Sequence, residues 1–106
     1  MFKKIYQVGQ NRGNKRIWIE GQVFKDISVT RGSRYSRTIK NKYLELAFDG
    51  EGPLTVAGTE DRPIIDMCGK WVSEFVGEFK HYKAVFIPAT PKNNMAMIEI
   101  RPIEVN

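Results

Sequence analysis

The sequence predicts a mainly β single domain with two short helices, folded as a small barrel from two repeated strand–helix–hairpin units. Short runs in which apolar and polar residues alternate are separated by segments rich in glycine and asparagine, which is typical of strands joined by turns. Two other segments place their apolar residues at helical spacing. The whole chain has 106 residues, a length that suits one hydrophobic core.

In the first half, we expect strands at residues 5–8, 16–19, 35–39, 43–48 and 54–57. Gly9–Asn14 is rich in glycine and asparagine and is expected to be a flexible turn. A short amphipathic helix is predicted at Gln22–Val29, because Val23, Phe24 and Ile27 are spaced along one helical face.

In the second half, we expect strands at residues 64–67, 81–88 and 95–100. A second short helix is predicted at Trp71–Val76, with Gly77 at its end. The predicted core of the whole domain consists of Ile17, Ile19, Phe24, Ile27, Leu44, Leu46, Ile65, Trp71, Phe75, Val85, Ile87 and Ile98.

The two halves follow the same plan, with units at about residues 5–57 and 62–103. A shift of 48 positions aligns Ile17 with Ile65 and Gly21 with Gly69, and a shift of 54 aligns residues 44–46 with 98–100. Most aligned pairs are similar and not identical. The sequence therefore favours an internal duplication, with chance alignment of two ordinary strand–turn–helix pieces as the alternative.

The positive charge is concentrated in the first half of the chain. The formal net charge is +5, yet residues 1–53 hold eleven Lys or Arg and five Asp or Glu, whereas residues 54–106 hold six and seven. The stretch from Arg31 to Lys42 contains five cations and no acid. Such a patch is typical of a phosphate-binding surface. The alternative is a solvated basic surface that serves solubility.

Composition argues against several classes of protein. No apolar run approaches the roughly 20 residues that span a bilayer, and no secretory signal is recognisable, so we expect a cytoplasmic protein without membrane contact. One cysteine and one histidine cannot form a disulfide or a zinc site by themselves. His81 has lysines and a tyrosine as sequence neighbours and no carboxylate partner among them. We therefore expect no catalysis, no metal and no tightly bound cofactor.

The segment Arg16–Phe24, followed by a short helix, the turn glycine Gly32 and a hairpin, resembles the swapped-hairpin barrels. These include the AbrB and MazE domains and the related SymE-type domain, in which two such units interlock into one barrel. Here both units would come from one chain. The family often has proline after the strand, where this chain has Glu20-Gly21, and aspartate in the turn before the hairpin, where it has Ser33.

The resemblance implies a small regulatory protein that binds nucleic acid, DNA more than RNA, through the basic loop and strands of the barrel face. Together with the basic run, it indicates the candidate residues Arg12, Lys15, Arg16, Arg31, Arg34, Arg37, Lys40 and Lys42. The loop counterparts in the second unit, Glu60, Asp61 and Arg62, are mostly acidic, so only one half of the barrel is expected to keep the DNA face.

Two alternatives stay open at this point. The aromatic residues are numerous enough to build an oligonucleotide-stacking face on an OB-like barrel; they are Trp18, Trp71, Tyr35, Tyr43 and Phe86. In a different class, the chain would be a small protein inhibitor or adaptor, such as a phage-encoded antagonist of a host nuclease. The sequence specifies neither the protein partner nor the oligomeric state.

Overall fold

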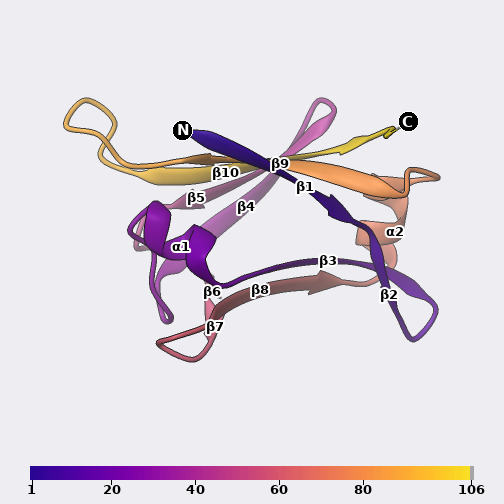
Figure 1. Ribbon diagram of the computed structural model, residues 1–106, viewed down its shortest axis with the longest axis horizontal. Coiled ribbons are helices and arrows are strands. Elements are labelled where there is room, and N and C mark those ends of the chain that lie inside the picture. Colours follow the sequence, from indigo (N-terminus) through magenta and orange to yellow (C-terminus); the bar gives the residue numbers. More distant parts are fainter. Residues whose placement is uncertain (106) are drawn as a thin grey trace.

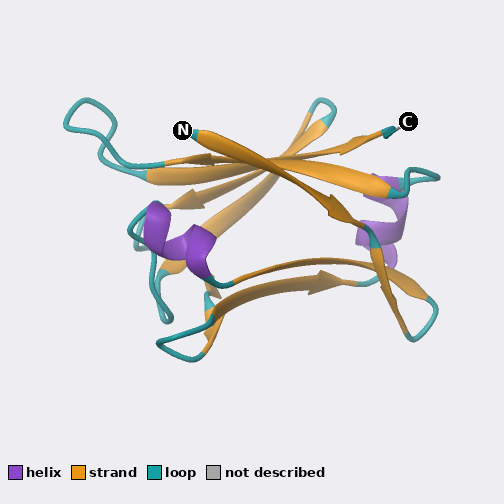
Figure 2. Ribbon diagram, viewed as in Figure 1, coloured by secondary structure: helices purple, strands orange, loops and turns teal. Residues whose placement is uncertain are grey.

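The structure, a computed structural model, describes residues 1–105 and consists of two antiparallel sheets that face each other, with one helix at each end between them (Figures 1 and 2). In chain order the elements are β1 (Phe2–Gln7), β2 (Gly9–Asn11), β3 (Asn14–Glu20), α1 (Gln22–Asp26), β4 (Arg34–Lys40), β5 (Tyr43–Phe48), β6 (Leu54–Thr55), β7 (Ala57–Gly58), β8 (Pro63–Cys68), α2 (Lys70–Val76), β9 (His81–Ile87) and β10 (Ala96–Ile103). Strands take up 51% of the chain and helices 11%, so the predicted mainly β class with two short helices is confirmed.

One sheet has six strands in the order β1-β9-β10-β5-β4-β6, and the other has four in the order β2-β3-β8-β7. Over residues 1–105 the two sheets do not close into one barrel, so the predicted barrel is not confirmed. No helix in this part of the chain is long and apolar enough to cross a membrane.

The core lies between the inner faces of the two sheets and is closed at the ends by α1 and α2 (Figure 1). Eight of the twelve predicted core residues are fully buried or nearly so; they are Ile17, Ile19, Phe24, Ile27, Leu44, Leu46, Ile65 and Ile98. The prediction was wrong for the other four, which are only half-buried; they are Trp71, Phe75, Val85 and Ile87. In β9 the inward face carries Tyr82, Ala84 and Phe86 instead. The sequence pattern did not distinguish the two faces of this strand, because Val85 and Ile87 on the outward face are also apolar.

The segment Gly9–Asn14, expected to be a flexible turn, is part of a regular hairpin. β2 pairs with β3, and Asn11 faces Asn14 across a two-residue turn. Arg12 and Gly13 at the tip have φ values of 53° and 83°. Positive φ at both central positions is typical of the type I′ turn, whose twist matches that of a hairpin. The candidate cations of this segment are therefore held by a strand ladder.

The pairing registers agree with the two shifts read from the sequence. At the centre of the β3–β8 pair, Trp18 faces Asp66, its own position shifted by 48. At the centre of the β5–β10 pair, Glu45 faces Glu99, its own position shifted by 54. Antiparallel strands pair in this way when a two-fold rotation relates them.

The outer strands continue the same relation, with partners exchanged between the units. β1 pairs with β9, where Tyr6 faces Tyr82. β6 pairs with β4, where Leu54 faces Tyr35. A shift of 48 takes Tyr6 to Leu54, and a shift of 47 takes Tyr35 to Tyr82. β1 of the first unit thus lies on the β9–β10 hairpin of the second unit. By the same relation β6 corresponds to β1 and β7 corresponds to β2, so that β6 lies on the β4–β5 hairpin of the first unit.

Candidate nucleic-acid interface

Lys15 is fixed against the C-terminal end of α2. Its backbone N–H donates to Ser73 Oγ at 2.9 Å, and its ammonium group donates to the carbonyl of Gly77. The carbonyls at the end of a helix lack intrahelical partners and carry partial negative charge, so a cation is stabilised there. The β2–β3 hairpin, which carries Arg12 at its tip, lies at the same end of the molecule as α2 (Figure 1).

Arg37 reaches the first turn of the same helix from β4. Its guanidinium carbon lies 4.3 Å from the centroid of the Trp71 ring, a cation–π contact that leaves the N–H groups at the guanidinium edge free to donate. A helix of seven residues is about 10 Å long. Lys15 and Arg37 therefore mark the two ends of α2, with the half-buried Trp71 beside Arg37.

Lys40 and Lys42 line a hollow together with α2 and the segment that follows it. The other lining residues are Ile39, Phe75, Phe79 and Pro102. Lys40 is also held by Glu45, with 3.3 Å between Nζ and the carboxylate. We call the surface formed by Arg12, Lys15, Arg37, Lys40 and Lys42, at the end of the molecule that holds α2, the α2 basic face.

Arg16 lies elsewhere, on the outer face of the four-stranded sheet. Its guanidinium donates to both carboxylate oxygens of Asp66, at 2.7 and 2.9 Å, and its carbon lies 4.2 Å from the centroid of the Trp18 ring. The hydrogen bond to Asp66 raises the pKa of Arg16 above its ordinary value. This cation is neutralised within the chain, which the sequence interpretation did not foresee.

Arg31 and Arg34 lie with β6 and β7, on the side of α1. Arg34 Nε donates to the carbonyl of Gly52 at 2.9 Å, and Arg31 lines a shallow hollow with residues of β6 and β7. Since α1 and α2 occupy opposite ends of the molecule (Figure 1), the eight predicted cations do not form one face. Five of them lie at the α2 end of the molecule, Arg16 lies on the outer face of the four-stranded sheet, and Arg31 and Arg34 lie on the side of α1.

The aromatic residues do not form a common stacking surface. Tyr35 and Phe86 are buried in the core, and Phe86 is stacked on Phe2 with 4.9 Å between ring centroids. Trp18 and Trp71 are half-buried, each beneath an arginine. Tyr43, on β5, has the guanidinium carbon of Arg101 5.4 Å from its ring centroid. The five rings therefore do not share one open face of the kind that the OB-like alternative requires.

The second unit differs from the first at the matching hairpin. β7 pairs with β8 in the register that β2 and β3 use, shifted by 48. By this register Arg12 corresponds to Glu60, as expected. Lys15 and Arg16 correspond to Pro63 and Ile64, and not to Asp61 and Arg62 as the sequence suggested. The matching positions at the α1 end thus carry no cation, and Arg62 in that hairpin is paired with Glu20, with 3.6 Å between Nε and the carboxylate.

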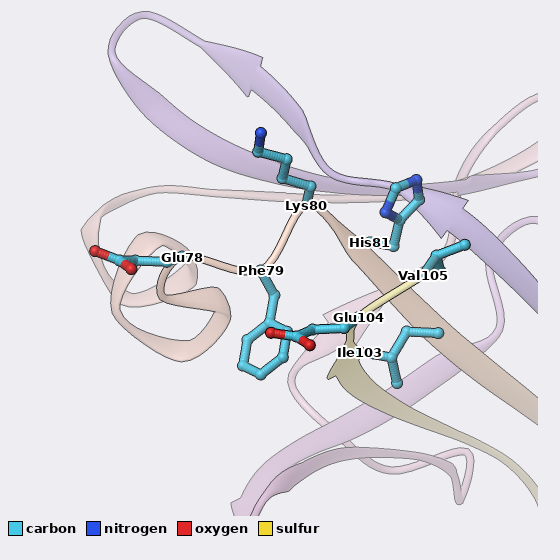
Figure 3. Close-up of a pocket in the computed structure, with 7 residues that line it drawn as sticks. All are labelled: Glu78, Phe79, Lys80, His81, Ile103, Glu104 and Val105. Atoms are coloured by element: carbon cyan, nitrogen blue, oxygen red, sulfur yellow. The ribbon is translucent and has the colours of Figure 1, made fainter.

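His81 lies at the rim of another hollow, of about 500 Å³, where the end of β10 passes the start of β9 (Figure 3). The side chains of Phe79 and Glu104 lie close together there, while Glu78 points away from them (Figure 3). Within residues 1–105, no group of three histidine, cysteine, aspartate or glutamate side chains is arranged to hold a metal ion. The hollow is lined by apolar and charged side chains and has no ligand set of its own.

The sequence interpretation missed the contribution of α2 to the candidate site. Trp71 and Phe75 were assigned to the core, and Phe79 was not considered. Phe79 is 40% exposed and Ile39 is 57% exposed, so both present apolar surface beside the cations. The sequence did contain a signal that Phe79 and Ile39 are exposed, because Phe79 lies between Glu78 and Lys80 and Ile39 directly precedes Lys40.

Comparisons with known proteins identify no relative of this chain. No family model, no curated protein and no solved structure matches the chain. The features of the chain that bear on its function are the α2 basic face and the two sheets.

Proposed function

We propose that this chain is a small nucleic-acid-binding regulatory protein that contacts duplex DNA, in preference to RNA, through the α2 basic face. The observation that carries the proposal is the pair of cations at the two ends of α2, Lys15 on the Gly77 carbonyl and Arg37 on the Trp71 ring. Side chains fixed in this way lose little freedom on binding a phosphate. Arg12 and Lys42, which are exposed at hairpin turns on either side, add further positive charge.

The exchanged strands support a kinship with the swapped-hairpin barrels. In those domains two units interlock, and here β1 lies on β9 while β6 lies on β4. A duplicated unit with only one cationic hairpin would place the DNA-contacting surface at one end of the molecule. This agrees with the excess charge of residues 1–53.

Backbone contact is favoured over base stacking. Trp18 and Trp71 each have one face covered by a guanidinium group, which reduces the ring surface open to a base. Contacts of cations with phosphates position a protein on DNA without reading its sequence. We therefore expect binding that depends strongly on salt and weakly on base composition.

The test measures the affinity of the full chain for a fluorescent duplex at several salt concentrations. The first variant replaces three cations of the α2 basic face that are not on β4: Arg12→Gln, Lys15→Gln and Lys42→Gln. The matched control removes the same charge elsewhere: Lys3→Gln, Lys25→Gln and Lys92→Gln.

Each lost phosphate contact is expected to reduce the slope of log affinity against log salt by about 0.9 for duplex DNA, or about 0.7 for a single strand. The salt slope of the variant of the α2 basic face should therefore fall by up to three times this amount, whereas the salt slope of the control variant should change little. Equal losses would mean that charge alone attracts DNA to the whole surface. Absence of binding by the unmodified protein at low salt would overturn the proposal.

A further inference from the structure

The edge strand β4 is paired over only part of its length. Among residues 1–105, β6 covers Arg34 and Tyr35, and no strand covers the edge from Arg37 to Lys40. The chain leaves β5, crosses β4 near Ser36 and returns as the two-residue strand β6. The close approach of Gly52 to the backbone of Tyr35 and Ser36 marks this crossing.

The free backbone groups can be assigned from the ladder. Residues of an antiparallel strand alternate in direction, so every second N–H and C=O points to the same neighbour. The carbonyl of Arg34 accepts from the N–H of Gly50, in the chain that continues β5. Arg37 and Ile39, which are odd-numbered, therefore point their N–H and C=O groups away from β5, toward the uncovered edge.

The same molecule shows how such an edge is covered. By the shift of 47, Arg37 and Ile39 correspond to Ala84 and Phe86 of β9. β1 lies along that edge and places Lys4 opposite Ala84 and Phe2 opposite Phe86. Phe86 is fully buried there, whereas Ile39 is 57% exposed. In the part of the chain that the structure describes, the β4 edge thus lacks the strand that its counterpart has.

The surface beside this edge is both apolar and cationic. Ile39, Phe75 and Phe79 line the hollow described above together with Lys40 and Lys42. From Arg31 to Phe48 the chain carries five cations and one acid, Glu45. An occupant of this surface needs an extended backbone, an apolar side chain opposite Ile39 and carboxylates near Arg37 and Lys40.

A second copy of the chain fits this surface poorly. Pairing β4 with β4 of another molecule would bring two groups of cations together, and like charges across a sheet are destabilising. An acidic segment of another protein has the complementary charge, and strand addition is a general mode of peptide recognition.

The geometry points to a strand-addition site on β4, at Arg37–Lys40, for an extended acidic segment of a partner protein. The segment runs antiparallel to β4, as β1 does on β9, and continues the line of β6. Its backbone bonds Arg37 and Ile39, and its apolar side chain enters the hollow against Phe75 and Phe79. This proposal does not depend on nucleic-acid binding, although both surfaces include Arg37 and Lys40.

The test uses a capped peptide, Thr-Glu-Phe-Thr-Glu-Thr, titrated into the full ¹⁵N-labelled chain without nucleic acid. In the antiparallel register its glutamates face Lys40 and Arg37, and its phenylalanine faces Ile39. The matched control is the same peptide with N-methyl groups on the phenylalanine and on the second glutamate, which removes two edge hydrogen bonds and keeps the charge. We expect the backbone amides of Arg37 and Ile39 to shift and to become protected from exchange.

The N-methylated peptide should bind about fivefold more weakly for each lost hydrogen bond. Ile39→Pro, which removes one outward N–H at an edge where proline is tolerated, should weaken the plain peptide by a similar factor. Ile39→Thr keeps that N–H and controls for the lost apolar side chain.

Three results would overturn the proposal. Equal binding of both peptides would show attraction by charge alone. Shifts of the same amides on raising the protein concentration without peptide would assign the edge to a second copy. Protection of these amides by a DNA duplex, with none by the peptide, would assign the edge to nucleic acid.

Discussion

The hydroxyl group of Tyr82 occupies the place of a missing strand beside Trp18. It accepts from the Trp18 N–H at 3.1 Å and donates to the Trp18 carbonyl at 2.8 Å. β2 covers β3 only as far as Arg16, so these two backbone groups would otherwise lie without a partner in a partly buried site. One side chain of the six-stranded sheet thereby completes the ladder of the four-stranded sheet.

Tyr82→Phe should destabilise the protein by about 1–3 kcal/mol, because it leaves both backbone groups of Trp18 without a partner. Denaturant unfolding followed by circular dichroism measures this free energy. Tyr35→Phe is the matched control, since Tyr35 is the counterpart of Tyr82 and has no such contact within residues 1–105. Equal effects of the two substitutions would contradict the role assigned to the Tyr82 hydroxyl.

Stability should fall as the pH rises above about 10, the ordinary pKa of tyrosine. Burial raises the pKa of Tyr6 to about 12 and raises that of Tyr82 further in the same direction. A raised pKa in the folded state means that the contribution is complete below the unfolded pKa and is lost as pH approaches the folded one. The unfolding free energy of the wild type and of Tyr82→Phe should therefore converge between pH 10 and pH 12. A constant difference over that range would argue against the raised pKa.

Asp49 should stabilise the crossing from β5 to β6 only while it is ionised. Its carboxylate accepts from the N–H groups of Glu51 and Gly52, and from the hydroxyl of Ser36. These bonds lower the pKa of Asp49 below its ordinary value, with the Glu51 N–H as the largest cause. The contribution is complete above the unfolded pKa, near 4, and is lost as the pH falls through the lowered one. The stability advantage of the wild type over Asp49→Asn, measured by urea unfolding, should therefore shrink below pH 4.

Gly52→Ala should be more destabilising than Gly50→Ala. A Cβ at Gly52 would overlap the backbone carbonyl of Tyr35 and the Ser36 nitrogen, and backbone cannot move aside easily. We expect a loss of about 2–4 kcal/mol in the free energy of unfolding. At Gly50, φ is +77° and the Cβ would have open space, so only about 1 kcal/mol of backbone strain is expected. A smaller loss at Gly52 than at Gly50 would mean that the crossing takes another path.

Local sequence patterns predicted most elements of this fold, because turns and short amphipathic segments leave clear signals. Both helices and both long hairpins are where the pattern indicates, although α1 ends at Asp26 and not at Val29. The inward face of β9 could not be predicted, since Val85 and Ile87 are as apolar as the residues that are buried. β1 extends to Phe2 because β9 pairs with it, and nothing in the first seven residues specifies that partner.

The candidate site was harder to predict than the fold. A run of cations indicates positive charge but not which groups are already paired. The Arg16–Asp66 pair joins residues 50 positions apart, and the Arg37–Trp71 contact joins residues on different elements. Such contacts depend on how the two units are placed, and no local pattern specifies that placement.

The Arg16–Asp66 pair gives the last prediction. Asp66 holds the Arg16 guanidinium with two hydrogen bonds, so the positive charge of that arginine is already compensated before a phosphate approaches. If binding reaches the outer face of the four-stranded sheet, Asp66→Asn should free Arg16, raise the affinity for duplex DNA and increase the salt slope by about 0.9. Arg16→Gln in the wild-type background should change the affinity little, because the cation it removes is already neutralised. Salt titrations of the two single variants and of the double variant separate these effects. If Asp66→Asn raises the affinity equally with and without Arg16, the gain comes from the lost negative charge alone; if it has no effect, bound DNA contacts only the α2 basic face.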